Sequence, residues 1–267
     1  MTAQRIALRG DLLDFVAAPA RAERDSPAVR FRPDHWLLIE GSRIVGAQAA
    51  APDITWRRID HAGKLVLPGF IDTHVHSPQL DVIGSWGAQL LDWLQTYTFP
   101  AESRMADPAQ AQAASQLFLD ALLAHGTTSA VVFPTVHKAS VDALFDAASQ
   151  RGMRLIAGKV LMDRHAPPEL CDDVEGAEAD CRELIERWHG RDRLAYAVTP
   201  RFAPTSSDAQ LAMAGRLLAD HEGLYMQTHL AENPAEVHWV AELFPKARSY
   251  LDVYERYGLL NERAVLA

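Results

Sequence analysis

Two histidines at the end of an apolar segment give this sequence its clearest chemical signal. His74 and His76 end the run that starts at Leu67, and a single residue separates them. Because successive side chains of a β-strand alternate between its faces, both imidazoles project the same way, about 6 to 7 Å apart along the backbone. Neutral imidazole is the commonest protein ligand for zinc and similar divalent ions. The pair therefore predicts a metal site at a strand end.

The residues just before this pair favour a metal site over two histidines that merely decorate a strand. The Pro68-Gly69 step interrupts the preceding chain. We expect Phe70 and Ile71 to supply a buried run, and we expect Asp72 to accept a hydrogen bond from a ligand imidazole.

A third histidine and a carboxylate occur together much later in the chain. His229 ends the apolar segment 225–229, and Glu232 follows three residues later. Taken alone, His229 would be an ordinary strand-end residue, but the His-x-His pair makes it a candidate third ligand. Glu232 lies where a chain leaving a strand can fold back over the site. Its carboxylate could serve as acid and base toward a water held by the metal.

Other polar and aromatic residues near these strand ends could recognise a flat ring. Arg201 offers a planar donor beside the aromatic face of Phe202, which suits a heteroaromatic substrate, although an arginine in such a loop is equally compatible with a surface role. Gln79 carries both a donor and an acceptor and could read the edge of a base. Trp86 and Trp93 follow the first histidines, and we assign them to the core rather than to the site.

Composition narrows the classes of protein that this chain can be. It has 267 residues, of which 48% are hydrophobic, and a formal net charge of −9. An acidic chain without a basic cluster is a poor ligand for nucleic acid, so a small-molecule partner fits better. No apolar run approaches the roughly 18 residues that cross a bilayer. Two cysteines, Cys171 and Cys181, do not make a disulfide framework, and we expect a cytoplasmic protein with no membrane partner.

Hydrophobic periodicity predicts two domains. Residues 1–66 contain short apolar runs separated by Gly, Pro and Asp, which predicts the N-terminal part of a small β-sandwich domain. Residues 67–267 alternate short apolar runs with amphipathic helices, which predicts an α/β fold, about strands 1 to 6 of a (β/α)8 barrel that is incomplete at the C-terminus, with its site at the carboxyl ends of the strands. The expected strands are 5–9, 35–40, 44–47, 56–59, 65–73, 127–133, 155–162, 194–199, 225–229 and 264–267. The expected helices are 109–125, 142–150, 177–189, 207–219 and 235–243.

Several of these motifs resemble a known family. The segment from Gly63 to His76 resembles the first-strand signature of the amidohydrolase superfamily. Within that superfamily, Ser77-Pro78-Gln79, the segment 91–102, Met162-Asp163-Arg164 and Arg201-Phe202 are similar to the guanine deaminases. The resemblance covers nearly the whole chain.

The resemblance implies zinc-dependent hydrolytic deamination of guanine to xanthine and ammonia, with one Zn²⁺ per subunit and a homodimeric assembly. The implied roles are metal ligation by His74, His76 and His229, proton transfer by Glu232, and purine contacts from Gln79, Arg201 and Phe202. Superfamily members with two metals commonly carry a bridging carboxylated lysine at the end of the fourth strand. This chain has Thr199-Pro200-Arg201 there, which favours one metal, and we interpret Lys159 as structural.

The family pattern continues with a histidine after the sixth strand and an aspartate after the eighth, and neither falls within these residues. We therefore expect the N-terminal part of a longer enzyme, with little or no deaminase activity in the 267 residues alone. Two alternatives stay open. The first is another aminohydrolase of the superfamily, acting on cytosine, a pterin, an oxidised purine or a chlorinated triazine. The second is an inactive metal-binding scaffold or oligomerisation partner.

Overall fold

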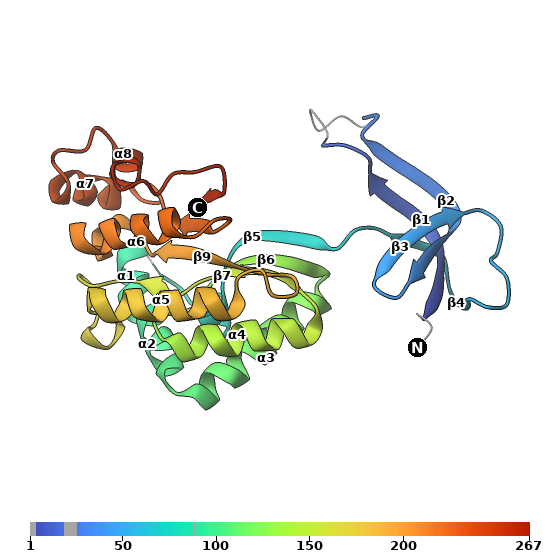
Figure 1. Ribbon diagram of the computed structural model, residues 1–267, viewed down its shortest axis with the longest axis horizontal. Coiled ribbons are helices and arrows are strands. Elements are labelled where there is room, and N and C mark those ends of the chain that lie inside the picture. The colour runs from blue at the N-terminus through green and yellow to red at the C-terminus, as the bar shows by residue number, and fades with distance from the viewer. Residues whose placement is uncertain (1–3, 19–25, 88) are drawn as a thin grey trace. The chain divides into compact units, whose positions relative to one another are not determined.

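The computed structural model describes residues 4–18, 26–87 and 89–267, and the chain divides into two compact units, residues 1–69 and 70–267 (Figure 1). The first unit holds a four-stranded sheet in the order β3-β2-β1-β4. Its strands are β1 (Arg5–Phe15), β2 (Val29–Glu40), β3 (Arg43–Gln48) and β4 (Arg57–Val66). β1 pairs antiparallel with β2 and parallel with β4, so the sheet is mixed.

Each strand expected in this unit overlaps an observed strand, and each observed strand is longer than expected. The apolar pattern covers only part of each strand, because charged residues form the rest of it. Arg30 on β2, for example, pairs with Asp14 on β1 at 2.5 Å, across the register that joins the two strands. Cross-strand ion pairs of this kind extend a sheet beyond its apolar segment.

The second unit is built on one parallel sheet of seven strands, in the order β11-β10-β9-β7-β6-β5 with β8 beside β9. Its strands are β5 (Phe70–His76), β6 (Thr127–Phe133), β7 (Arg154–Ala157), β8 (Val160–Leu161), β9 (Leu194–Pro200), β10 (Tyr225–Thr228) and β11 (Ala264–Leu266). Apart from the short β8, neighbours in space are neighbours in the chain, as sequential βα units require. The predicted α/β fold with a parallel sheet is confirmed.

Helices connect these strands. They are α1 (Leu90–Trp93), a π-helical turn η2 (Leu94–Thr98), α2 (Phe99–Ser103), α3 (Pro108–Ala124), α4 (Lys138–Arg151), α5 (Val174–Trp188), α6 (Asp208–Asp220), α7 (Pro234–Leu243) and α8 (Tyr250–Arg256), with shorter 3₁₀ turns η1 (Ser77–Val82), η3 (Arg104–Ala106), η4 (Pro168–Leu170) and η5 (Ala203–Thr205). α3 packs on β6, α4 on β7, and both α5 and α6 on β9 (Figure 1). Leu144, Leu155 and Tyr196 are fully buried in the resulting core.

The expected strand 65–73 is wrong in its bounds and in its burial. Leu65 and Val66 end β4 in the first unit, whereas His74 and His76 lie inside β5. Phe70 and Ile71 were expected to be buried but are 57% and 72% exposed. β5 has only β6 beside it in the part of the chain that the structure describes, so its other edge pairs with no strand among these residues.

The expected strand 155–162 is interrupted at Gly158 and Lys159, between β7 and β8. A Cβ atom at Gly158 would lie 1.8 Å from the carbonyl oxygen of Ala197, so the backbones approach too closely there for any other residue. Lys159 is buried and its Nζ donates to Asp172 at 2.5 Å. Its side chain is therefore engaged in a largely buried ion pair.

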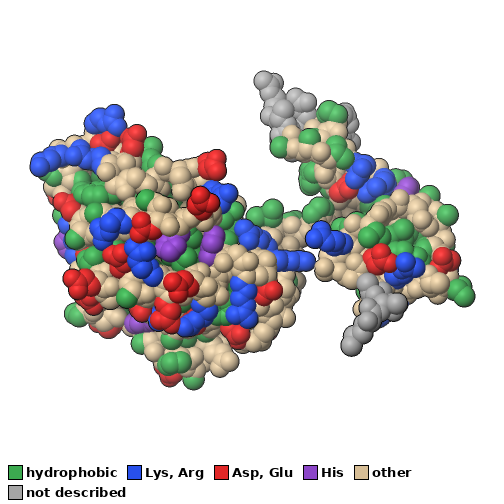
Figure 2. Space-filling view, viewed as in Figure 1, with side chains coloured by type: hydrophobic (Ala, Val, Ile, Leu, Met, Phe, Trp, Pro, Cys, Tyr) green, Lys and Arg blue, Asp and Glu red, His purple; other side chains and the backbone are tan. Residues whose placement is uncertain are grey.

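Acidic and basic side chains are mixed on the face of the second unit that carries α4, α5 and α6 (Figure 2). Several of them pair between helices, such as Arg182 with Asp220 at 2.7 Å and Arg187 with Asp142 at 2.7 Å. Within residues 4–18, 26–87 and 89–267, none of the helices is both long enough and apolar enough to cross a bilayer.

Candidate functional site

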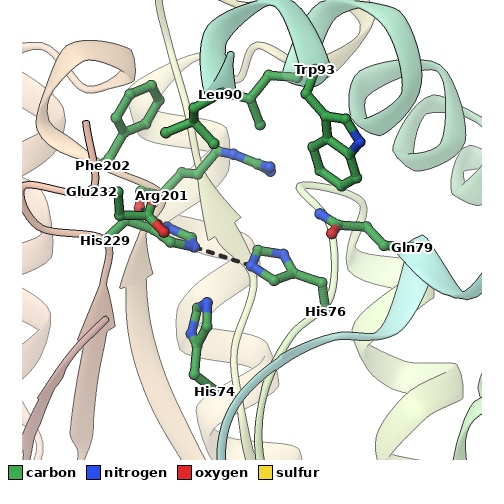
Figure 3. Close-up of a pocket in the computed structure, with 10 residues that line it drawn as sticks. His74, His76, Gln79, Leu90, Trp93, Arg201, Phe202, His229 and Glu232 are labelled. Atoms are coloured by element: carbon green, nitrogen blue, oxygen red, sulfur yellow. Dashed lines mark hydrogen bonds between the residues drawn. The ribbon is translucent and has the colours of Figure 1, made fainter. Parts of the chain in front are cut away.

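The three predicted metal ligands converge at the carboxyl ends of the strands. β5 supplies His74 and His76, and His229 follows β10 directly. One nitrogen from each ring lies within 4.8 Å of the other two, and the Nε2 atoms of His76 and His229 are 3.0 Å apart (Figure 3). The fold thus brings together residues separated by 153 positions in the chain.

Hydrogen bonding fixes which nitrogen of His229 is free. Its Nδ1 lies 2.7 Å from the carbonyl oxygen of Arg201, which can only accept, so Nδ1 carries the proton and Nε2 presents a lone pair toward His76. Burial lowers the pKa of His229 to about 3 and holds the pKa of His76 well below its usual value. Both rings are therefore neutral, which is the form that binds metal.

This donor set fits a divalent metal ion. The Nδ1 atom of His76 is buried without a hydrogen-bond partner among the described residues, whereas its Nε2 atom faces His229. Two imidazoles on one tetrahedral zinc place their nitrogens about 3.3 Å apart, close to the 3.0 Å between His76 and His229. Three neutral histidines that leave a fourth position open are typical of catalytic zinc sites.

Phe133, the last residue of β6, packs against this cluster. Its ring centroid lies 4.9 Å from that of His76 and 4.5 Å from that of His229. Phe133 was not among the predicted site residues, although it stands opposite His76 in the β5–β6 register. An aromatic residue at the end of the neighbouring expected strand was the available signal.

Glu232 lies on the same cavity, in the loop between β10 and α7. The carboxylate of Glu236 accepts the backbone N–H of Glu232 at 3.0 Å and that of Asn233 at 3.2 Å, while Asn233 caps α7. Ala231 adopts a left-handed φ of 58°, which turns the chain back over the strand end. Burial, reinforced by the charge of Glu236, raises the pKa of the Glu232 carboxyl. The loop therefore presents a proton carrier beside the histidines.

All seven predicted site residues line one cavity of about 210 Å³ (Figure 3). The lining consists of His74, His76, Gln79, Leu90, Trp93, Leu94, Arg201, Phe202, His229 and Glu232. This volume is below the roughly 300 Å³ at which pockets for drug-sized ligands begin, so it suits a small molecule.

Three details differ from expectation. Trp93, which we assigned to the core, lines the cavity together with Leu90 and Leu94, whereas Trp86 is 81% exposed. Asp72 accepts the backbone N–H of His74 at 3.1 Å rather than an imidazole N–H, so it shapes the strand and not the ring.

The third detail concerns Arg201. Its guanidinium is buried and pairs with Glu102 of α2, a contact that the sequence analysis missed. Glu102 lies in the segment 91–102, whose similarity to the guanine deaminases gave no role to any single residue in it. No local pattern joins two residues 99 positions apart.

Comparison with known proteins places this site in a family context. Residues 65–267 match the model of the amidohydrolase family. The chain is 47% identical over 267 residues to the guanine deaminase of Escherichia coli (strain K12), covering 98% of this chain and 61% of that protein. The chain therefore spans about three fifths of the length of this relative.

Solved structures of guanine deaminases also match this chain. The structure of the E. coli guanine deaminase matches with a TM-score of 0.93 over 98% of this chain and 62% of that chain. A guanine deaminase from C. acetobutylicum with guanine bound in its active site is 26% identical, with a TM-score of 0.88, and is matched over 98% of this chain and 62% of that chain.

Proposed function

The chain belongs to the amidohydrolase family, and we propose on that basis that it works in the zinc-dependent hydrolytic deamination of guanine to xanthine and ammonia. The observation that carries the proposal is the cavity itself. Three imidazoles, a half-buried carboxylate, a guanidinium and an aromatic face line a single small space. The guanine deaminase similar to this chain that holds guanine in its active site supports the choice of substrate.

His74, His76 and His229 would hold the metal. A zinc ion bound there supplies a water activated for nucleophilic attack near neutral pH. Glu232 would carry the two protons of the attacking water in turn, the first to a ring nitrogen and the second to the departing amino group. In the overall reaction the water oxygen becomes bonded to the ring carbon, the carbon–nitrogen bond breaks, and the nitrogen leaves as ammonia.

The remaining lining residues would bind and orient the purine. Arg201 would donate to the ring carbonyl, Phe202 would pack on the ring face, and Gln79 would read the edge. Trp93, Leu90 and Leu94 add apolar walls that exclude water from the other side.

We further propose that residues 67–267 form strands 1 to 6 of a (β/α)8 barrel, and that residues 1–66 belong to a small β-sandwich. The match between strand order and chain order supports the barrel. The mixed sheet of β1 to β4 supports one layer of the sandwich.

For its setting we propose a homodimer in the cytoplasm. The family resemblance supports the dimer, and the scarcity of cysteine supports a reducing compartment. Light scattering on the purified protein tests the dimer, and a single-chain mass would contradict it.

Zinc binding tests the first part of the proposed function. We expect about one zinc per chain by elemental analysis, and we expect His76→Ala to weaken zinc binding by at least about tenfold. His238→Ala is the matched control, because His238 is 79% exposed on α7 and pairs only with Glu242. Zinc retained equally by both variants would contradict the assigned ligands.

Substrate choice is tested on the zinc-loaded protein by calorimetry. We expect guanine to bind more tightly than cytosine, a pterin or a triazine. A stronger response to one of those amines would transfer the proposal to that substrate.

A further inference from the structure

The Arg201 side chain has a dedicated partner behind the cavity. Its Nη1 donates to both carboxylate oxygens of Glu102, at 2.8 and 2.6 Å, and both side chains are almost completely buried. The carboxylate thus binds the Nη1 group of the guanidinium. The N–H groups on Nη2 and Nε can face the cavity that Arg201 lines.

The same carboxylate also holds Gln79. The Nε2 atom of Gln79 donates to Oε1 of Glu102 at 3.3 Å. Because a carboxylate only accepts, the amide must turn its nitrogen toward Glu102, which leaves its carbonyl oxygen available as an acceptor. In Figure 3 the guanidinium of Arg201 extends toward the side of the cavity from which Gln79 projects.

An irregular helix brings Glu102 to this position. In a continuous α-helix that starts at Leu90, Phe99 and Glu102 would point away from the face that carries Trp93 and Leu94. The π-helical turn Leu94–Thr98 holds about one residue more than an α-helical turn. The side chains that follow are therefore rotated by about 100° around the helix axis. Phe99 then lies under the guanidinium, with its ring centroid 5.3 Å from Cζ of Arg201, and Glu102 reaches its edge.

We infer that Glu102 is a positioning residue that fixes the hydrogen-bonding polarity of the cavity, with donors from Arg201 and an acceptor from Gln79. This inference rests on the proposed function. It narrows the ligand to a ring that carries both a carbonyl oxygen and an N–H group on the edge that these side chains face. A purine without that carbonyl leaves the Arg201 donors buried and unpaired, which a site of this kind rejects.

Glu102→Gln tests the inference with little change in side-chain volume. The substituted amide can donate as well as accept, so it no longer forces one orientation on Gln79 and no longer balances the charge of Arg201. The ligands are guanine and 2-aminopurine, which lacks the carbonyl. We expect the native protein to prefer guanine by at least about tenfold, and we expect E102Q to reduce that preference by about tenfold. Zinc content should not change, because His229 is held by the backbone carbonyl of Arg201.

Asp172→Asn is the matched control. It removes the carboxylate of another buried ion pair, that of Asp172 with Lys159, whose two residues do not line the cavity. A general loss of stability would weaken both ligands equally in E102Q and in D172N, whereas a positioning role changes the ratio in E102Q alone. An unchanged ratio in E102Q, with binding otherwise intact, overturns the inference.

A second measurement does not depend on the ligand. The side-chain N–H signals of Gln79 and Arg201 in NMR spectra should shift in E102Q and stay unchanged in D172N. Unshifted signals in E102Q would also overturn the inference. Failure of the native protein to bind guanine, by contrast, overturns the proposed function itself.

Discussion

The two sides of the cavity are supported very differently. Every residue of β9 is buried, and β9 leads directly to Arg201, whose backbone carbonyl anchors His229. β5, which carries His74 and His76, has exposed or half-buried residues along its whole length. The β9–β10 side therefore sets the geometry of the site, whereas the β5 side contributes ligands with much less packing behind them.

A buried tyrosine strengthens the β9–β10 side. The hydroxyl of Tyr254 on α8 accepts the backbone N–H of Ala203 at 2.9 Å, and it donates to the carbonyl oxygen of His229 at 2.9 Å. The Oγ1 atom of Thr228 lies within 2.9 Å of the same hydroxyl. One side chain thus ties together the ends of both strands.

Breaking the Arg201–Glu102 pair should have the largest effect. Arg201→Ala leaves the fully buried Glu102 without a charge partner, so we expect the free energy of unfolding to fall by about 3–5 kcal/mol. His74→Ala, on the β5 side, should lower the stability of the metal-free protein by less than about 1 kcal/mol, because His74 is only half-buried. Urea unfolding of both variants measures the difference, and equal losses would contradict the asymmetry.

Truncating apolar side chains should reveal the same difference between the two sides. Leu155→Ala on β7, next to β9, empties a fully buried position and should cost about 2–5 kcal/mol. Ile71→Ala on β5 should cost less than about 0.5 kcal/mol, because Ile71 is 72% exposed. A large loss in I71A would show that another segment or a second copy covers this face of β5 in solution.

Removal of the Tyr254 hydroxyl should have a smaller effect. Tyr254→Phe leaves the Ala203 N–H and the Thr228 hydroxyl short of a buried partner, which should cost about 1–3 kcal/mol. Tyr257→Phe is the control, because the Tyr257 hydroxyl bonds only to Asp208 in an exposed setting, at 2.8 Å. Thermal melting compares the two, and an equal shift in melting temperature would argue against the role of Tyr254 in supporting the strand ends.

The apolar periodicity of the sequence predicted strands and helices well where it extended over the whole element. β6 has the expected bounds 127–133, and α3 lies within one residue of its expected ends, with Asp107 capping its start. α4 and α5 begin earlier than expected, at Lys138 and Val174, because polar first turns hide their apolar periodicity. The helical segment that begins at Leu90 and the helix α8 went unpredicted, since short irregular helices carry too few turns for a period to show.

The residues that could do chemistry can be found from the sequence alone: two imidazoles on one face of a strand, a third at a later strand end, and the residues Glu232, Arg201, Phe202 and Gln79 that line the same cavity. Strand alternation and strand ends are local properties, so a linear reading can find them. The pairing of Glu102 with Arg201, the packing of Phe133 on the histidines and the exposure of Phe70 and Ile71 became visible only in the folded chain. Each of these depends on which strand lies beside which and on the phase of one irregular helix, and long-range packing sets both.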